Sequence, residues 1–148
     1  LLFMMAGSLH HKAGTRLIPK LGGVAHKMPV WAVFMVAASL AGLGLLFTSS
    51  FVAEFTVLVG SLQAFNVLAL FVFPAAMATA GYLLYAMRRA VFGPFNTNLN
   101  IHGDLNTQEF VAMFLLLILT ILLGVYPRLI LDMIDAYSVY FVTLIGGV

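Results

Sequence analysis

Residues 28–63 read MPVWAVFMVAASLAGLGLLFTSSFVAEFTVLVGSLQ and carry one charged side chain, Glu54. A membrane-spanning helix needs about 20 mostly apolar residues. Residues 28–47 reach this length without a charge, whereas residues 48–63 are shorter, begin with Thr48-Ser49-Ser50 and contain the carboxylate. We therefore expect a transmembrane helix over 28–47. A short or discontinuous helix should follow over 48–63 and pack inside protein, because irregular backbone at membrane depth is tolerated only away from lipid.

The composition of the whole chain indicates a membrane protein. Of the 148 residues, 63% are hydrophobic and 8% are charged, and the mean hydropathy is +1.09. Soluble domains are about 45–50% apolar and about 25% charged, so a water-soluble globule is excluded. The chain has no Cys, which excludes disulfides, thiolate metal sites, Fe–S clusters and Cys nucleophiles within it. Basic loops beside the membrane account for the pI of about 9.2, so we expect no nucleic-acid partner.

The rest of the chain divides into further membrane segments and connecting loops. We expect the tail of a preceding transmembrane helix over 1–9, a basic loop over 10–27, a transmembrane helix over 64–92, a polar loop over 93–109, a transmembrane helix over 110–127 and an interfacial helix over 128–148. The predicted fold class is therefore all-α and integral to the membrane. It is a polytopic helix bundle of about four membrane segments, one short or broken, plus a C-terminal interfacial helix.

Local signals mark the ends of some of these elements. Asn106 and Glu109 fit a capping box that opens the last transmembrane helix. Trp31 near the start of a span is typical of an interfacial anchor. The basic loop 10–27 and the Arg88-Arg89 pair both favour the cytoplasmic or matrix side. They share a side only if segment 49–63 makes no full crossing, so the sidedness is left open.

Glu54 is the candidate functional residue, because a carboxylate at bilayer depth costs about 2.5–3.5 kcal/mol on insertion scales. Ser50 at i−4 and Ser61 at i+7 share its helix face, which indicates a hydrated surface turned towards protein. A buried carboxyl group gains or loses its proton as a cation moves away or approaches, which is the chemistry of a proton relay. Alternatively, Glu54 pairs with a Lys or Arg of another helix only to fix assembly.

A second group of polar residues recurs on the segment 64–92. Tyr82 and Tyr85 follow Thr79 at helical spacing, and Arg89 lies four residues after Tyr85. This strip either lines a file of water molecules or forms an interhelical packing seam.

The histidines His10, His11, His26 and His102 are candidates for proton entry, although solvated His in loops is the commoner situation. Their spacing builds no convincing metal site.

Four stretches, taken together and in order, resemble the antiporter-like membrane subunits of respiratory complex I, the proton-pumping NADH:quinone oxidoreductase. They are AGSLHHKAGTRLIPKLGGVAHKMP (6–29), ASLAGLGLLFTSSFVAEF (38–55), YAMRRAVFG (85–93) and LGVYP (123–127). The second stretch resembles the discontinuous twelfth helix of those subunits, whose ionisable residue is Lys in two subunit types and Glu in one. Glu54 matches the type with Glu, the chain-four type. The resemblance implies that Glu54 is the terminal protonatable group of the half-channel leading out of the subunit.

The sequence departs from the family pattern around the helix break. Leu46 and Phe47 stand where the family has Pro-Gly, and Ser50 and Ala53 replace glycines. Without the Pro we expect a less sharp break, since Pro removes a helix hydrogen bond. The resemblance covers the C-terminal third or so of the subunit. It therefore implies a split or truncated subunit, with a separate chain that carries the N-terminal helices and the Lys that faces Glu54.

The resemblance implies a proton-translocating membrane-arm subunit of the respiratory NADH:ubiquinone oxidoreductase, itself without redox chemistry. NADH, flavin, Fe–S clusters and quinone would be held by other subunits, and this chain would hold no cofactor or metal. The expected partners are other complex I membrane subunits and membrane lipids. The expected location is the mitochondrial inner membrane, with the bacterial plasma membrane as the alternative. Two alternative functions stay open: a non-pumping scaffold, and a subunit of a related sodium/proton antiporter or membrane hydrogenase.

Overall fold

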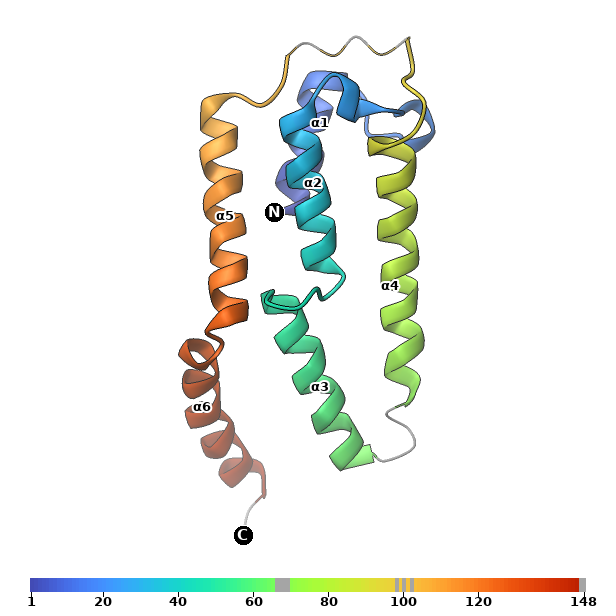
Figure 1. Cartoon of the computed structure of the whole chain (residues 1–148). Coiled ribbons are helices and arrows are strands. Elements are labelled where there is room, and N and C mark those ends of the chain that lie inside the picture. Colours follow the sequence, from blue (N-terminus) through green and yellow to red (C-terminus); the bar gives the residue numbers. More distant parts are fainter. Residues whose placement is uncertain (66–69, 98, 100, 102, 147–148) are drawn as a thin grey trace.

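The computed structural model describes residues 1–65, 70–97, 99, 101 and 103–146, and this part of the chain is helical with connecting segments. Figure 1 shows the helices arranged side by side and end to end. Their bounds are α1 Leu2–Ala13, α2 Pro29–Gly42, α3 Ser49–Phe65, α4 Val72–Ala86, α5 Thr107–Val125 and α6 Arg128–Gly146. Short 3-10 turns (η1 Ile18–Lys20, η2 Val24–His26) lie between α1 and α2, and a π-helical turn, η4 Met87–Val91, extends α4.

The segments predicted as a full helix over 28–47 and a short helix over 48–63 form two successive half-helices. In Figure 1, α3 continues in the direction of α2, and α4 returns alongside them. At 1.5 Å per residue the 14 residues of α2 measure about 21 Å, which is less than the roughly 30 Å of a bilayer core. The helix stops at Gly42 because Gly44 and Phe47 adopt left-handed backbone angles, with φ of 69° and 73°.

The basic loop packs directly on the end of α4. The helix α1 runs on to Ala13, further than the predicted tail 1–9, and the connection then reaches residues 93–96. The backbone N–H of Asn96 donates to the carbonyl of Gly22 at 3.3 Å. The basic loop and the Arg88-Arg89 pair therefore lie at the same end of the molecule, because α2 and α3 together make one descent and α4 one return (Figure 1).

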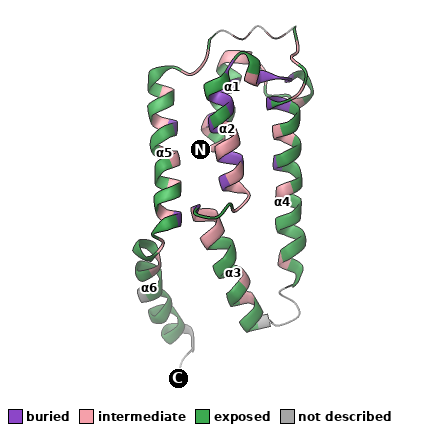
Figure 2. Ribbon diagram, viewed as in Figure 1, coloured by how far each residue is buried: buried purple, intermediate pink, exposed green. Residues whose placement is uncertain are grey.

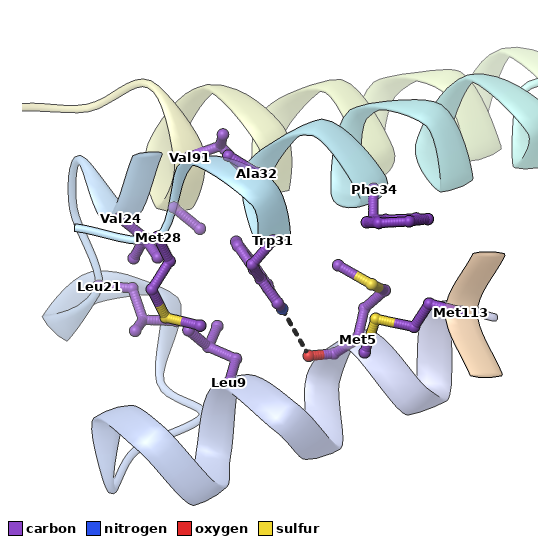
Figure 3. Close-up of a cluster of buried hydrophobic side chains, with 11 residues drawn as sticks. Met5, Leu9, Leu21, Val24, Met28, Trp31, Ala32, Phe34, Val91 and Met113 are labelled. Atoms are coloured by element: carbon purple, nitrogen blue, oxygen red, sulfur yellow. Dashed lines mark hydrogen bonds between the residues drawn. The ribbon is translucent and has the colours of Figure 1, made fainter. Parts of the chain in front are cut away.

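The buried core lies at this basic end. Figure 3 shows Trp31 of α2 between side chains from α1, from α5 and from the segment before α2, among them Met5, Met28 and Met113. Trp31 is 1% exposed, and its Nε1–H donates to the carbonyl of Met5 at 3.1 Å. Trp31 is thus a core residue and not the interfacial anchor that its position in the sequence indicates.

Polar groups of the loop 93–109 fix the starts of two helices. The carboxylate of Asp104 accepts the backbone N–H groups of Val30 at 2.8 Å and Trp31 at 3.1 Å, and so caps α2 from a distant part of the chain. The predicted capping box at α5 is confirmed, with Asn106 and Glu109 bonding each other's backbone N–H groups.

In the described part, α5 is the one helix that is long and apolar enough to cross a membrane by itself. The predicted C-terminal helix is present as α6, and its interfacial location stays a prediction. Outside the core, most side chains of α3, α4 and α6 are exposed, as the green ribbon in Figure 2 shows. Many of them are large and apolar, such as Phe73, Met77 and Phe141, so these faces require lipid or other protein helices around them.

Candidate functional site at the helix break

The connection between α2 and α3 is built around a tight turn. The backbone N–H of Thr48 donates to the carbonyl of Leu45 at 3.0 Å, and Phe47 at the third position has a φ of 73°. Leu46 at the second position has no positive φ, so the turn is of type II, which favours Pro-Gly at these two positions. The break therefore forms although Leu46 and Phe47 replace that pair, and the strained backbone of Phe47 is the cost.

The hydroxyl of Thr48 completes the turn. It is buried, and its Oγ1 donates to the carbonyl of Leu45 at 2.6 Å. Oγ1 also lies 3.5 Å from the carbonyl oxygen of Ala41 in the last turn of α2, where helix carbonyls lack intrahelical i+4 donors. Thr48 thereby stabilises the end of the first half-helix.

The carboxylate of Glu54 lies against the backbone of this break. A Cβ atom at Gly44 would lie 2.7 Å from Oε2 of Glu54, so no other residue fits there without displacing the carboxylate. Gly44 also needs its left-handed φ of 69°, which L side chains rarely adopt. Gly44 thus permits both the left-handed backbone and the close approach of the carboxylate, which lies beside the interruption in the helix.

The helix α5 supports the break from the other side. Gly124 is buried, and a Cβ atom there would lie 2.2 Å from the carbonyl oxygen of Phe47. The backbone of α5 therefore packs directly on the turn that positions Glu54. The sequence shows Gly124 only as part of the LGVYP stretch, because a helical glycine by itself does not indicate what packs against it.

Glu54 lines a groove of about 560 Å³ between α3 and α4. Apolar side chains such as Phe55 and Phe73 line most of it, and Thr79 of α4 is another lining residue. Glu54 is exposed, so the expected burial is not provided by this chain. Within the described residues Glu54 takes part in no hydrogen bond or ion pair, so a cation for it would have to come from outside them.

The other predicted site residues do not line this groove. Ser50 is half-buried on α3, and Ser61 donates its hydroxyl proton to the carbonyl of Leu58 at 2.9 Å. Tyr82 is exposed on α4. The hydroxyl oxygen of Tyr85 accepts a hydrogen bond from Nη1 of Arg89 at 2.8 Å, at the basic end of the bundle. Relay roles for these four residues stay predictions.

Lys12 is engaged far from Glu54. Its side chain is 8% exposed, and Nζ lies 3.6 Å from Oε2 of Glu109, whose Oε1 accepts the hydroxyl proton of Ser8 at 3.2 Å. Lys12 also donates to the backbone carbonyl of Asp104. This pairing and the cap that Asp104 forms were missed from the sequence, since partners 70 to 100 positions apart leave no local signal. Among the residues that the structure describes, no His, Asp and Glu gather as a metal site, and His102 lies outside them.

Known proteins are similar to this chain over most of its length. Residues 1–79, which include the break and Glu54, match the family model described as NADH:quinone oxidoreductase/Mrp antiporter, TM. The chain is 38% identical to the F(420)H(2) dehydrogenase subunit M of Methanosarcina mazei, over 99% of this chain and 30% of the relative.

Two further relatives carry related names. Identity is 37% with the NADH-quinone oxidoreductase subunit M of Rhodobacter capsulatus, over 90% of this chain and 26% of the relative. The chain is 33% identical to the NADH-ubiquinone oxidoreductase chain 4 of Marchantia polymorpha, over 88% of this chain and 27% of the relative. The chain thus spans less than a third of the length of these curated relatives.

Proposed function

Because the chain belongs to the transmembrane antiporter family of NADH:quinone oxidoreductase and Mrp complexes, and there to the subunit M or chain 4 type, we propose that it translocates protons within a membrane-bound redox complex. Glu54 is the group in this chain that takes up and releases the proton. The observation that carries the proposal is the position of the carboxylate, which lies beside a helix break and lines an apolar groove, with no cation of the described residues bound to it.

In this mechanism the charge of Glu54 is controlled from outside the 148 residues. A cationic side chain that approaches the groove stabilises the carboxylate, and its withdrawal favours uptake of a proton. Where further helices cover the groove, its apolar walls exclude water and make this control strong, since charges interact more strongly in such surroundings. The expected source is a Lys of the N-terminal helices of the same subunit type, carried by a separate chain or by further sequence.

The redox chemistry belongs to other subunits in this proposal. The names of the relatives differ in the electron donor, which is F(420)H(2) in one and NADH in the others. The expectation of NADH and ubiquinone therefore stays a prediction. The same holds for flavin, Fe–S clusters and quinone as cofactors of partner subunits. The expected mitochondrial inner membrane stays a prediction too, with the bacterial plasma membrane as its alternative.

We also propose an orientation of the chain in the membrane, which rests on the distribution of its charges. Six of the seven Lys/Arg lie in residues 12–27 or at the end of α4, and these segments share one end of the molecule (Figure 1). Of the five carboxylates, Asp104 and Glu109 lie at that end. By the positive-inside rule, this excess of basic residues supports a cytoplasmic or matrix location for that end, and the sidedness stays a proposal.

The proposal is tested with Glu54→Gln in the assembled complex, and Asp132→Asn on α6 serves as a charge-matched control. Gln keeps the shape of the side chain but cannot exchange a proton, so proton translocation should fall at least about tenfold while the amount of assembled complex is unchanged. The control should translocate like the parent. Unchanged translocation in Glu54→Gln would instead identify the chain as a scaffold.

The identity of the partner subunits distinguishes the remaining alternatives. Mass spectrometry of the purified complex should find a redox arm that oxidises NADH or another soluble electron donor. Hydrogenase or antiporter subunits without such an arm would contradict the proposed complex.

A further inference from the structure

A second cavity, of about 520 Å³, lies at the basic end of the molecule and shares no lining residue with the Glu54 groove. Tyr85 of α4 and Arg88 and Arg89 of η4 form one wall. Residues of the basic loop and of the segment after η4, among them Gly22 and Phe95, form the other. The cavity is therefore assembled from three separate parts of the sequence around two guanidinium groups.

The charge of this cavity is positive and uncompensated. Arg88 and Arg89 are exposed, and none of the five carboxylates, all of which lie in the described part of the chain, pairs with either of them. The C-terminal end of a helix carries about half an elementary negative charge, which is less than the two positive charges of the arginines. Lys27 adds a third cation nearby, with Nζ 6.0 Å from the ring centre of Phe95.

Contacts within the chain fix the walls of the cavity. The side-chain amide of Asn96 donates to the carbonyl of Lys20 at 2.9 Å, and Arg89 is held by the hydroxyl of Tyr85. A Cβ atom at Gly22 would lie 2.5 Å from the carbonyl oxygen of Pro94, so the two connections pack backbone against backbone. Such preorganisation lowers the entropy cost of binding a ligand.

An apolar strip runs along α4 away from Arg88. Met77, Gly81 and Leu84 precede it at intervals of four, three and four residues, which places all of them on one helix face. Met77 is 74% exposed and Leu84 is 49% exposed. Nothing lies within 4 Å of the position of a Cβ atom at Gly81, so the strip has open space at its centre.

We propose that this cavity binds the phosphate group of an anionic phospholipid, with the headgroup at Arg88 and Arg89 and one acyl chain along the strip of Met77, Gly81 and Leu84. Guanidinium groups bind phosphate oxygens in a forked geometry, and basic pockets at membrane boundaries recognise acidic headgroups. A free phosphate anion has the same chemistry at the arginines but makes no use of the apolar strip. The strip therefore favours the lipid as the source of the phosphate.

The test uses native mass spectrometry of the detergent-purified complex, titrated with phosphatidylglycerol or with phosphatidylcholine. Each arginine near a membrane surface adds to the binding free energy for anionic lipid. The loss of both in Arg88→Gln/Arg89→Gln should weaken phosphatidylglycerol binding on the order of 30-fold. The control Arg16→Gln/Arg128→Gln removes the same charge elsewhere and should bind like the parent. Both arginines of the cavity are exposed and contribute little packing, so the double variant is expected to assemble.

Two further arms separate the sources of the phosphate. Gly81→Leu fills the strip without a change in charge and should weaken binding of phosphatidylglycerol, and inorganic phosphate should not displace the lipid. If inorganic phosphate displaces the lipid and Gly81→Leu binds the lipid normally, the site belongs to a free anion and the proposal of a lipid ligand is overturned. Undiminished binding in Arg88→Gln/Arg89→Gln, or an equal loss in the control variant, would overturn the site itself.

Discussion

The contact between α5 and the helix break predicts that Gly124→Ala destabilises the protein. The new Cβ atom would lie 2.2 Å from the carbonyl oxygen of Phe47 and 2.4 Å from the carbonyl carbon of Thr48. Both are backbone atoms, so α5 must move by about 1 Å to restore an ordinary contact. Overpacking of this kind costs about 1–3 kcal/mol. Replacement of Gly by Ala inside a helix stabilises the folded protein by about 0.5–1 kcal/mol, so the steric cost is the larger of the two effects.

Gly60→Ala is the matched control, because it makes the same chemical change on α3 where nothing lies within 4 Å of the new atom. It should stabilise by about 0.5–1 kcal/mol. The free energy of unfolding is measured for the full chain in detergent micelles by titration with a denaturing detergent. We expect the two variants to change stability in opposite directions. A Gly124→Ala protein as stable as the Gly60→Ala protein would refute the packing of α5 on the break.

Three further substitutions test other parts of the structure by the same unfolding measurement. Leu46→Pro/Phe47→Gly should stabilise the protein by about 1 kcal/mol, because it removes the backbone strain of a left-handed Phe47 that is 69% exposed and so contributes little packing. A loss of stability would exclude the type II turn. Asp104→Ala removes the cap of α2 and should cost about 0.5–2 kcal/mol, whereas Asp135→Ala on α6 should cost less than half of that. Ser39→Ala should stabilise by about 1 kcal/mol, since the buried Ser39 hydroxyl has no hydrogen-bond partner among the described residues, and a loss would reveal a bound partner.

The sequence predicts those features that depend on neighbouring residues. The polar run Thr48-Ser49-Ser50 indicates an interrupted helix, and the structure has the interruption directly before Ser49. The spacing of Asn106 and Glu109 predicts the capping box, since both partners lie within one helical turn. These signals are local and need no knowledge of the fold.

The features that the sequence does not reveal depend on contacts between distant segments. The end of α2 at Gly42, five residues before the predicted end, is fixed by left-handed backbone angles at Gly44 and Phe47, and Phe is not a residue that indicates such an angle. Trp31 could be placed in the core only once α1 was known to pack beside it. The shared end of the basic loop and the Arg88-Arg89 pair likewise follows from the topology of the half-helices.

The exposure of Glu54 has a different cause. Its carboxylate lies where the resemblance implies, beside the helix break, but the described residues supply neither the expected cover nor the expected cation. Both belong, in the proposed function, to helices outside these 148 residues. Sequence patterns locate an ionisable group along the chain, whereas burial is a property of the assembly.

The most direct test of the central claim observes the protonation of Glu54 itself. Infrared difference spectra of the assembled complex, recorded between resting and electron-transferring states, report the carboxyl groups that gain or lose a proton. We predict a protonated-carboxyl band that is absent in Glu54→Gln and unchanged in Asp132→Asn. A spectrum of Glu54→Gln with every carboxyl band of the parent would contradict the claim that this residue carries the proton.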